Sequence, residues 1–263
     1  MSGRYLWILL AVLLVVPVTG EAQVSPDTRL LQRVERDGAV FTGAYLDGQF
    51  RYQKWDNAKG WLFGPTIAMT IPDLPQLELG SRAFLVSMDP DGGSSETGIG
   101  DIDIWGKYQF IDDPVLLAAG MLFTLPTGDE DVMHYNATGE FNVEFFGALR
   151  YYIQDSVALI GDIGLRMNAD ADIKTAGGKV EADGETQFML GAGVIFEATP
   201  ELDILGEIDF ATEAYKDFDS QIELTGGVEY AFTEAFAGRG GIGIGLDDGA
   251  PDFELILAAS FIF

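Results

Sequence analysis

The last stretch of the chain, Asp252–Phe263, reads DFELILAASFIF and alternates between two kinds of side chain. Phe, Leu and Ala occupy every second position, and the positions between them include Asp252, Glu254 and Ser260. Successive side chains of a β-strand point to opposite faces, so the pattern predicts a strand with one apolar face and one wetter face. A tilted strand of about 9–11 residues crosses the apolar core of a bilayer. The stretch therefore predicts a membrane-spanning strand.

A chain that ends on such a strand with a terminal Phe resembles bacterial outer-membrane β-barrels. The resemblance implies that the last strand closes the barrel and carries the signal read by the barrel assembly machinery. It also implies a location in the bacterial outer membrane. The rest of the chain is then expected to repeat the same unit.

Similar stretches from Ala39 onward predict about twelve strands. We place them near residues 39–53, 60–71, 76–88, 99–110, 115–125, 139–152, 156–168, 185–197, 201–212, 220–232, 236–246 and 252–263. The connections alternate between short ones, such as IDDP and IQDS, and mostly longer acidic ones, such as DPDGGSSETG. Outer-membrane barrels have short periplasmic turns and longer outer loops. The sequence thus predicts an all-β fold, a transmembrane antiparallel up-and-down β-barrel of about 12 strands.

Composition agrees with this fold and excludes several functions. The 33 glycines are too many for a helical protein, and the absence of cysteine excludes disulfides and thiolate catalysis. The formal charge of −27 argues against nucleic acid as a partner, because phosphate binding needs clustered Lys and Arg. The acidic side chains must lie in wet surroundings, and diffuse cation bridging from the outer loops to lipopolysaccharide is one expectation.

The N-terminus reads as an export signal. Arg4, an apolar core at 5–16 and a small-residue cleavage site predict a signal peptide over residues 1–22. Residues 23–38 are expected to form a periplasmic N-terminal tail or short helix, because their apolar residues have helical spacing. The outer-membrane β-barrel is then expected to span residues 39–263.

The strand faces opposite the apolar ones carry charged side chains. A charge at bilayer depth is costly on the lipid face, so these side chains are expected to pair or to meet water in the lumen. The candidates for lining the lumen are Glu78, Arg82, Asp101, Asp103, Lys107, Glu144, Arg150, Asp162, Arg166, Asp203, Glu207, Glu229, Arg239 and Glu254.

Two interpretations of these charges remain open. The lumen could be closed by salt-bridged side chains, as in small barrels, or it could surround a path for solute. A barrel of about eight strands is filled by side chains, and one of sixteen or more leaves an aqueous channel. Inward glycines at 191, 193, 241, 243 and 245 leave space beside their strands and favour a passage.

A hairpin in the first half of the chain carries a family resemblance. The stretches GIGDIDIWGKYQF (Gly98–Phe110) and LAAGMLFTLPTGDE (Leu117–Glu130) look like the hairpin typical of the outer-membrane family named for the meta-pathway of phenol degradation. The matching positions are Gly98, Gly100, Asp101, Lys107, Tyr108, Pro126, Thr127, Gly128 and Asp129. The resemblance implies a transporter, associated in some members with hydrophobic or aromatic compounds, and it transfers no substrate.

Two side chains of this hairpin also carry a prediction made from the residues themselves. Asp101 and Lys107 share the inward face of one predicted strand, where they could neutralise each other.

Enzymatic and metal functions find little support. The single histidine, His134, lies in the predicted loop DEDVMHYNATG without a catalytic signature around it, and we interpret it as a solvated loop residue. Acidic pairs such as Asp101 with Asp103 are interpreted as wall charges. The acidic loops have no EF-hand spacing, so neither a metal site nor a cofactor is predicted.

The sequence therefore predicts an outer-membrane channel for passive uptake of small solutes, with hydrophobic or aromatic ones among the candidates. The alternative is a closed-lumen structural or adhesion barrel that presents its acidic loops at the surface.

Overall fold

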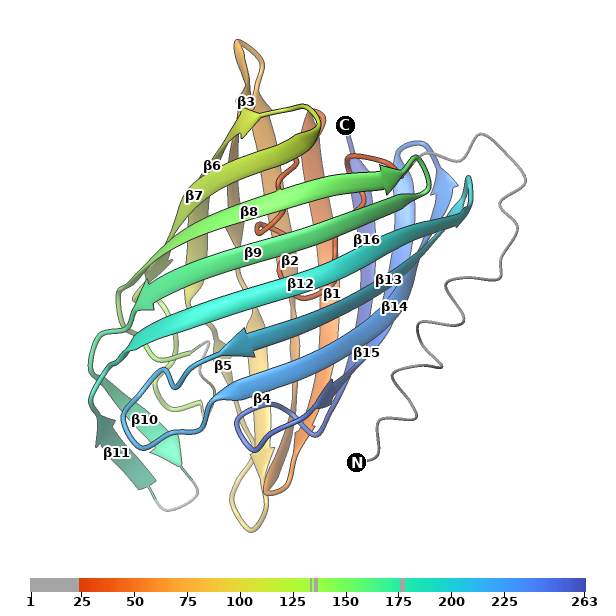
Figure 1. The fold of residues 1–263 in the computed structure, drawn as a ribbon. Helices are drawn as coiled ribbons and strands as arrows, with labels where there is room; N and C mark the ends of the chain where they lie inside the picture. The colour runs from red at the N-terminus through yellow and green to blue at the C-terminus, as the bar shows by residue number, and fades with distance from the viewer. Residues whose placement is uncertain (1–23, 133, 135–136, 176–177) are drawn as a thin grey trace.

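The computed structural model describes residues 24–132, 134, 137–175 and 178–263 (Figure 1). The expected signal peptide, residues 1–22, lies outside the described residues. No helix long and apolar enough to cross a membrane occurs among the residues described.

The described chain forms a closed antiparallel barrel of twelve strands, with a separate hairpin beside it. Two of the twelve are each divided by a short break, so that β3 continues as β4 and β5 continues as β6. The wall consists of β1 (Ala44–Trp55), β2 (Ala58–Ile71), β3 (Leu74–Arg82) with β4 (Leu85–Pro90), β5 (Glu96–Ile99) with β6 (Ile102–Ile111), β7 (Val115–Leu125), β8 (Asn142–Gln154), β9 (Val157–Met167), β12 (Thr186–Thr199), β13 (Leu202–Ala211), β14 (Gln221–Thr233), β15 (Phe236–Gly245) and β16 (Phe253–Ile262). The extra hairpin consists of β10 (Ala171–Thr175) and β11 (Gly178–Ala182).

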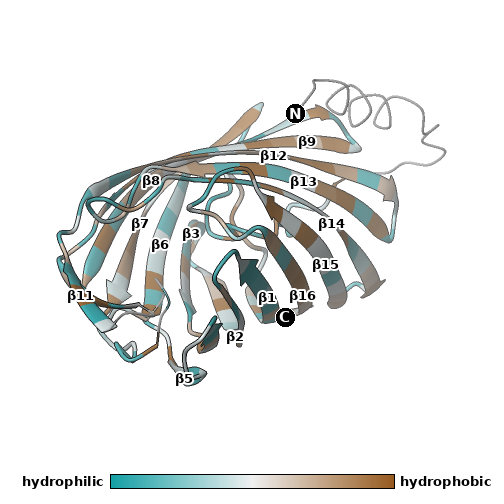
Figure 2. Ribbon diagram, turned by 90° about the horizontal axis from the view of Figure 1, so that it is seen from below, coloured by the Kyte–Doolittle hydropathy of each residue, from teal (hydrophilic) through white to brown (hydrophobic). Residues whose placement is uncertain are grey.

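The last strand closes the barrel, as its sequence predicts. β16 pairs with β1 from Tyr45 opposite Ile262 to Lys54 opposite Phe253. Glu254 and Ile256 are fully buried, whereas Leu257 and Phe261 are 49% and 41% exposed. Apolar and polar residues alternate along the wall strands in the same manner (Figure 2). The exposed apolar face is the one expected to meet lipid.

Proline in β2 interrupts the neighbouring strand rather than its own. Proline lacks the N–H that a ladder needs, so Gly64-Pro65 within a strand predicts a bulge. The pairing of β1 with β2 instead runs unbroken through Gly48 opposite Pro65. The break lies across the ladder at residues 83–84, between β3 and β4, and a Cβ on Gly64 would overlap Ala83 there.

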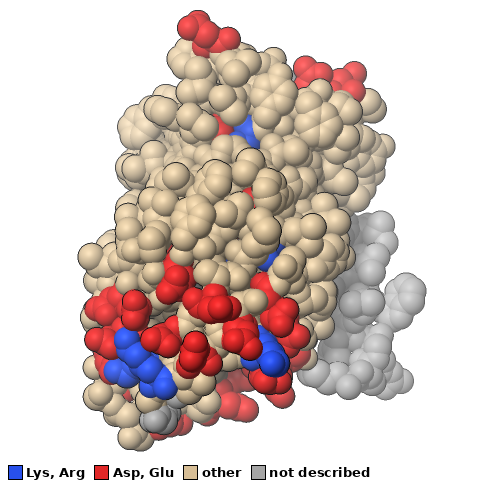
Figure 3. All heavy atoms as spheres, turned by 90° about the vertical axis from the view of Figure 1, so that its left-hand side faces the viewer, with Lys and Arg blue, Asp and Glu red and all other residues tan. Residues whose placement is uncertain are grey.

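The connections differ between the two ends of the barrel. At the upper end in Figure 1 they are short, such as residues 72–73 between β2 and β3 and residues 155–156 between β8 and β9. The lower end carries the long connection 126–141 and the β10–β11 hairpin. Acidic side chains gather at that end, below a largely uncharged band (Figure 3). The short end corresponds to the expected periplasmic side and the long end to the outer side.

Residues 24–43 lie inside the barrel, and we call them the luminal segment. Val24 N–H donates to the Asp155 carbonyl at the short-turn end, and Phe263 N–H donates to Ala44 where the segment joins β1. Between these points the chain bends into the barrel and returns, without helical structure. This position corrects the expected periplasmic tail or short helix at 23–38, because the polar groups of the segment find partners on the charged wall.

Candidate functional site: the barrel interior

A buried arginine of the wall holds the luminal segment near the short-turn end. Arg150 on β8 donates from Nε and Nη2 to the two carboxylate oxygens of Asp37, at 3.0 and 2.6 Å. It also donates to the Ser25 and Thr28 carbonyls, at 3.0 and 2.5 Å. Both charged side chains are almost inaccessible to solvent. A bidentate guanidinium–carboxylate pair fixes geometry as well as charge, so this contact anchors the segment in one position.

Carboxylates on β13 and β16 bind the middle of the luminal segment. Glu207 accepts the backbone N–H groups of Leu31 and Gln32 at 2.8 and 3.2 Å. The Gln32 side-chain amide donates to Glu254 at 2.6 Å. Glu254 also accepts a hydrogen bond from Gln53 on β1. These acids supply acceptors to a backbone that makes no ladder of its own, which explains how irregular chain is tolerated inside the barrel.

Arginines of the luminal segment pair with acids near its tip. Arg36 lies 2.5 Å from Glu144 and 3.0 Å from Asp162. Arg33 reaches Asp162 and Asp209, both at 3.2 Å. Since a buried charge is costly without a partner, the wall acids and the segment arginines each compensate the other.

Most of the predicted lumen-lining residues bond to the luminal segment. They are Glu78, Arg82, Lys107, Glu144, Arg150, Asp162, Asp203, Glu207, Glu229, Arg239 and Glu254. The structure thus brings these side chains together around a chain segment rather than around open space. Of the other three, Asp103 pairs with Arg82 at 2.8 Å, whereas Asp101 and Arg166 lie nearer the long connections.

The charges of the sequence indicated that this segment lies inside the barrel, but the helical spacing of its apolar residues suggested a periplasmic tail or helix instead. The fourteen predicted lumen residues comprise nine carboxylates and five cations. Three arginines and three acids stand together in residues 27–37, just before the first strand. A short stretch with charges of both signs, next to strands that turn charges of both signs inward, predicts an internal ion-pair partner.

The expected pairing of Asp101 with Lys107 is wrong. Lys107 pairs with Glu78 at 3.2 Å and donates to the Ala39 carbonyl at 2.8 Å. The Asp101 carboxylate accepts backbone N–H groups of the 126–141 connection, among them Gly128 at 2.7 Å and Thr138 at 2.9 Å. Asp101 therefore fixes the start and end of that connection. Its inward-facing position on the strand did not predict this role.

Two of the five predicted inward glycines, Gly193 and Gly241, leave space for the luminal segment rather than for solute. A Cβ on Gly193 would overlap Leu30, and one on Gly241 would overlap Leu31. Leu30 and Leu31 are both buried, in a cluster with Ile195, Leu205 and Ile256 of the wall. These two glycines thus mark close approaches of the segment to the wall, whereas a Cβ on Gly191, Gly243 or Gly245 would meet Asp162, Glu223 or Pro251 of the barrel itself.

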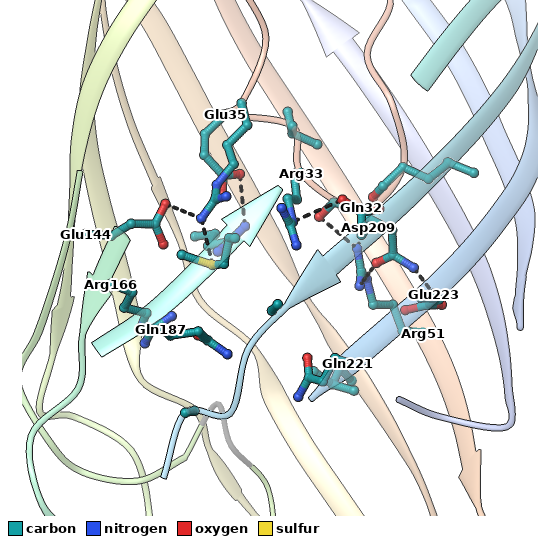
Figure 4. Close-up of a pocket in the computed structure, with 18 of the residues that line it drawn as sticks. Gln32, Arg33, Glu35, Arg51, Glu144, Arg166, Gln187, Asp209, Gln221 and Glu223 are labelled. Carbon is teal, nitrogen blue, oxygen red and sulfur yellow. Dashed lines mark hydrogen bonds and ion pairs between the residues drawn. The ribbon is translucent and has the colours of Figure 1, made fainter. Parts of the chain in front are cut away.

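A cavity remains between the tip of the luminal segment and the long-connection end (Figure 4). Its volume is about 200 Å³. Polar lining comes from Arg33, Arg51, Glu144, Arg166, Gln187, Asp209, Gln221 and Glu223, and apolar lining from Leu62, Phe84, Met189, Ala211, Ala214 and Tyr215. The luminal segment therefore fills part of the barrel interior and leaves a cavity on the side of the long connections.

His134 is buried, contrary to its interpretation as a solvated loop residue. It is 6% exposed, its Nε2 lies 3.1 Å from Gln53 Oε1, and its ring meets Trp55 edge-on. Burial, with a smaller contribution from the positive charge of Arg51, lowers its pKa from 6.5 to about 3. The ring is thus neutral near pH 7 and helps to hold the 126–141 connection against β1. Among the described residues, no group of three or more His, Asp or Glu is arranged to hold a metal ion.

No protein-family model matches the chain. No curated protein matches it either. Membership of the phenol-degradation family therefore stays a prediction.

Solved structures share its fold. An outer membrane channel from Pseudomonas putida F1 aligns with a TM-score of 0.69 at 14% identity, covering 86% of this chain and 97% of that chain. The KdgM porin aligns at 0.54 and 9% identity, covering 82% and 99%. The CymD monoaromatic hydrocarbon channel aligns at 0.51 and 9% identity, covering 85% and 89%. The chain thus has the fold of outer-membrane channels.

Proposed function

We propose that this protein is a bacterial outer-membrane channel for passive uptake of small solutes, with the luminal segment as its internal restriction. The observation that carries the proposal is a closed twelve-stranded barrel whose interior holds a segment of its own chain and a polar cavity. The solved neighbours described as channels and porins support it. No catalytic residue is proposed.

The contacts of the luminal segment suit a part that moves. Its bonds to the wall are mostly hydrogen bonds and ion pairs, which water can replace when the segment is withdrawn. Its apolar anchors are few, chiefly Leu30, Leu31, Val34 and Phe41. An apolar core would instead resist hydration. Hydrophobic and aromatic solutes remain the expected cargo from the family resemblance, and CymD is a channel for monoaromatic hydrocarbons.

A second function follows from the same segment. If it never leaves, the barrel is a closed structural or adhesion protein that presents its acidic outer connections to a partner. The filled interior at the short-turn end favours this alternative, and the cavity favours the channel.

A reversible lock distinguishes the two. The chain has no cysteine, so Leu31→Cys with Gly241→Cys introduces a single pair at a place where the two residues touch. The mature protein is placed in liposomes, and flux of ions, small sugars and phenol is measured with the pair oxidised and then reduced. We expect flux through the unmodified protein, little through the oxidised variant and recovery on reduction.

The single-cysteine variants control for the substitutions themselves. Flux through the oxidised double variant should be lower than flux through either of them. Absence of flux for every solute in the unmodified protein would favour the closed barrel. Equal flux in the oxidised and reduced states would show that the luminal segment is not the restriction.

A further inference from the structure

One arginine in the cavity differs from all the others. Arg33, Arg36, Arg51 and Arg82 each have a carboxylate within 4.0 Å. Arg166 on β9 forms no ion pair among the described residues, and its Nη2 donates a hydrogen bond to Thr124 Oγ1 at 3.0 Å. Its Nε is buried without a hydrogen-bond partner. In a chain with a net charge of −27, an uncompensated cation facing a cavity indicates a binding site.

The neighbours of Arg166 leave its charge available. Glu144 lies directly across from it on β8, but the Glu144 carboxylate is turned to Arg36 at 2.5 Å. Gln187 lies across on β12, and its amide donates to the Thr212 carbonyl. Figure 4 shows Arg166 and Gln187 side by side at one edge of the cavity. The guanidinium therefore has free N–H groups. Its two cross-strand neighbours are polar but not cationic.

The rest of the cavity lining indicates what kind of molecule could carry the anionic group. Met189 is two residues from Gln187 on the same face of β12, and Leu62 and Phe84 line the cavity from β2 and the break before β4. Tyr215, in the 212–220 connection, closes the outer side, and burial raises the pKa of its phenol, which stays neutral. A volume of about 200 Å³ suits a single substituted ring, because a dry cavity of about 150 Å³ is known to hold benzene.

We propose that this cavity binds a small organic monocarboxylate with an apolar body, whose carboxylate meets the Arg166 guanidinium. Arginine presents paired N–H groups that match the two oxygens of a carboxylate, and the match gives both affinity and orientation. The apolar body then lies against Met189, Leu62 and Phe84. The inference rests on the proposed channel function for its physiological sense, because it names a cargo class for the same interior.

The test measures equilibrium binding to the mature, refolded protein in detergent. Benzoate is the probe, benzamide is its neutral isostere, and binding is followed by calorimetry. The variants are Arg166→Gln and Arg166→Lys, with Lys59→Gln as the matched control. Lys59 is an exposed cation on β2 that pairs with Asp89, away from the cavity lining, so its loss changes the net charge equally. A heat-dependent gel shift confirms that each variant is a folded barrel.

We expect benzoate to bind and benzamide to bind at least ten-fold more weakly. Arg166→Gln should weaken benzoate binding by ten-fold or more, since a hydrogen bond to a charged group contributes about 1.5–3 kcal/mol. Arg166→Lys should recover part of the affinity, and Lys59→Gln should bind as the unmodified protein does.

Three outcomes would overturn the inference. They are no binding of benzoate, equal binding of benzoate and benzamide, and equal losses in Arg166→Gln and Lys59→Gln. The liposome flux experiment decides the channel separately. Flux without selective binding would support the channel and contradict the carboxylate site. Selective binding without flux would support the site and contradict the channel.

Discussion

Buried charges on the barrel wall are paired with charges from the luminal segment, residue by residue. Arg150 binds both carboxylate oxygens of Asp37, and both side chains are nearly excluded from solvent. Breaking a buried pair by removing one partner costs about 3–5 kcal/mol, because the other charge is left uncompensated. Single residues in the wall therefore control the position of a whole segment.

Asp37→Asn should release the luminal segment. The neutral amide cannot balance Arg150, so the segment should leave the barrel often enough to expose Arg29, Arg33 and Arg36. Limited trypsin digestion of the refolded protein measures this directly, and we expect cleavage after these arginines to accelerate at least ten-fold.

Asp183→Asn is the matched control for that substitution. Asp183 is an exposed acid paired with Lys216 at 3.6 Å, and exposed pairs contribute little. Its digestion pattern should equal that of the unmodified protein. Unchanged protection in Asp37→Asn would show that the pair does not anchor the segment.

His134 should make the 126–141 connection sensitive to acid. Its folded pKa of about 3 lies below the ordinary value of 6.5, so its neutral form is the one favoured by the fold. The stability it contributes is present above pH 6.5 and is lost as the pH falls from 6.5 towards 3. Acrylamide quenching of tryptophan fluorescence should increase over this window as Trp55 loses its cover.

Many carboxylates titrate in the same window, so a variant isolates the histidine. His134→Gln retains a group able to bond to Gln53 but cannot titrate. Its quenching should be less dependent on pH than that of the unmodified protein. Identical profiles for the two proteins would exclude His134 as the cause.

Individual faces could be predicted from the sequence, but individual partners could not. Glu254 and Arg239 are buried as the alternation predicts, because strand parity is a local property. The partner of Lys107 depends on the register between β3 and β6, which places Glu78 directly opposite it. Register is set by long-range pairing, and so the local pattern suggested Asp101 instead.

At the scale of elements, the strands were predictable and the luminal segment was not. The predicted stretch 156–168 corresponds to β9 at Val157–Met167, since alternation and turn residues fix a strand locally. The segment 24–43 has no periodic structure, and its conformation comes entirely from the wall around it. The cavity was equally hidden, because it is the space that the segment leaves unfilled.

Close packing between β15 and the luminal segment gives a prediction at this scale. Gly241→Ala should push Leu31 away from the wall and destabilise the folded protein by about 1–3 kcal/mol, the usual cost of overpacking. Leu31→Ala added to it should recover part of that loss. The measurement is urea unfolding in liposomes, arranged as a double-mutant cycle.

The outward glycine next to it provides the control. A Cβ on Gly240 would make an ordinary contact with Leu257 at 3.6 Å, so Gly240→Ala should be nearly neutral. An additive cycle, or equal losses at both glycines, would show that Leu31 does not depend on the space at Gly241.

The whole molecule carries its charge unevenly. Acidic side chains gather at the long-connection end, whereas the band below the short turns presents few charges (Figure 3). Inside, the wall acids outnumber the wall cations, and the luminal segment pairs with both kinds but carries as many acids as arginines, so the excess of acid remains. In the proposed channel, the net charge of −27 therefore acts on permeating ions as well as on solubility.

Deletion of residues 24–42 should give a cation-selective pore. The deletion removes three arginines and three carboxylates, so the open interior keeps the acid excess of the wall, with Glu144, Asp162 and Glu207 facing water. Reversal potentials across a planar bilayer in a KCl gradient should then favour K⁺ over Cl⁻ several-fold. Anion selectivity would contradict this account of the interior, and the full-length protein in the same gradient provides the reference.

Both ends of the luminal segment lie at one mouth of the barrel, since Val24 bonds to Asp155 and Ala44 bonds to Phe263 there. The segment is thus a loop that enters and leaves the barrel at the same end, and the chain does not pass through the barrel from one end to the other. It can enter after the β1–β16 seam has closed and can leave again without any free end passing the constriction. Insertion and withdrawal are therefore topologically unobstructed, and only the strength of the non-covalent bonds decides how often they occur.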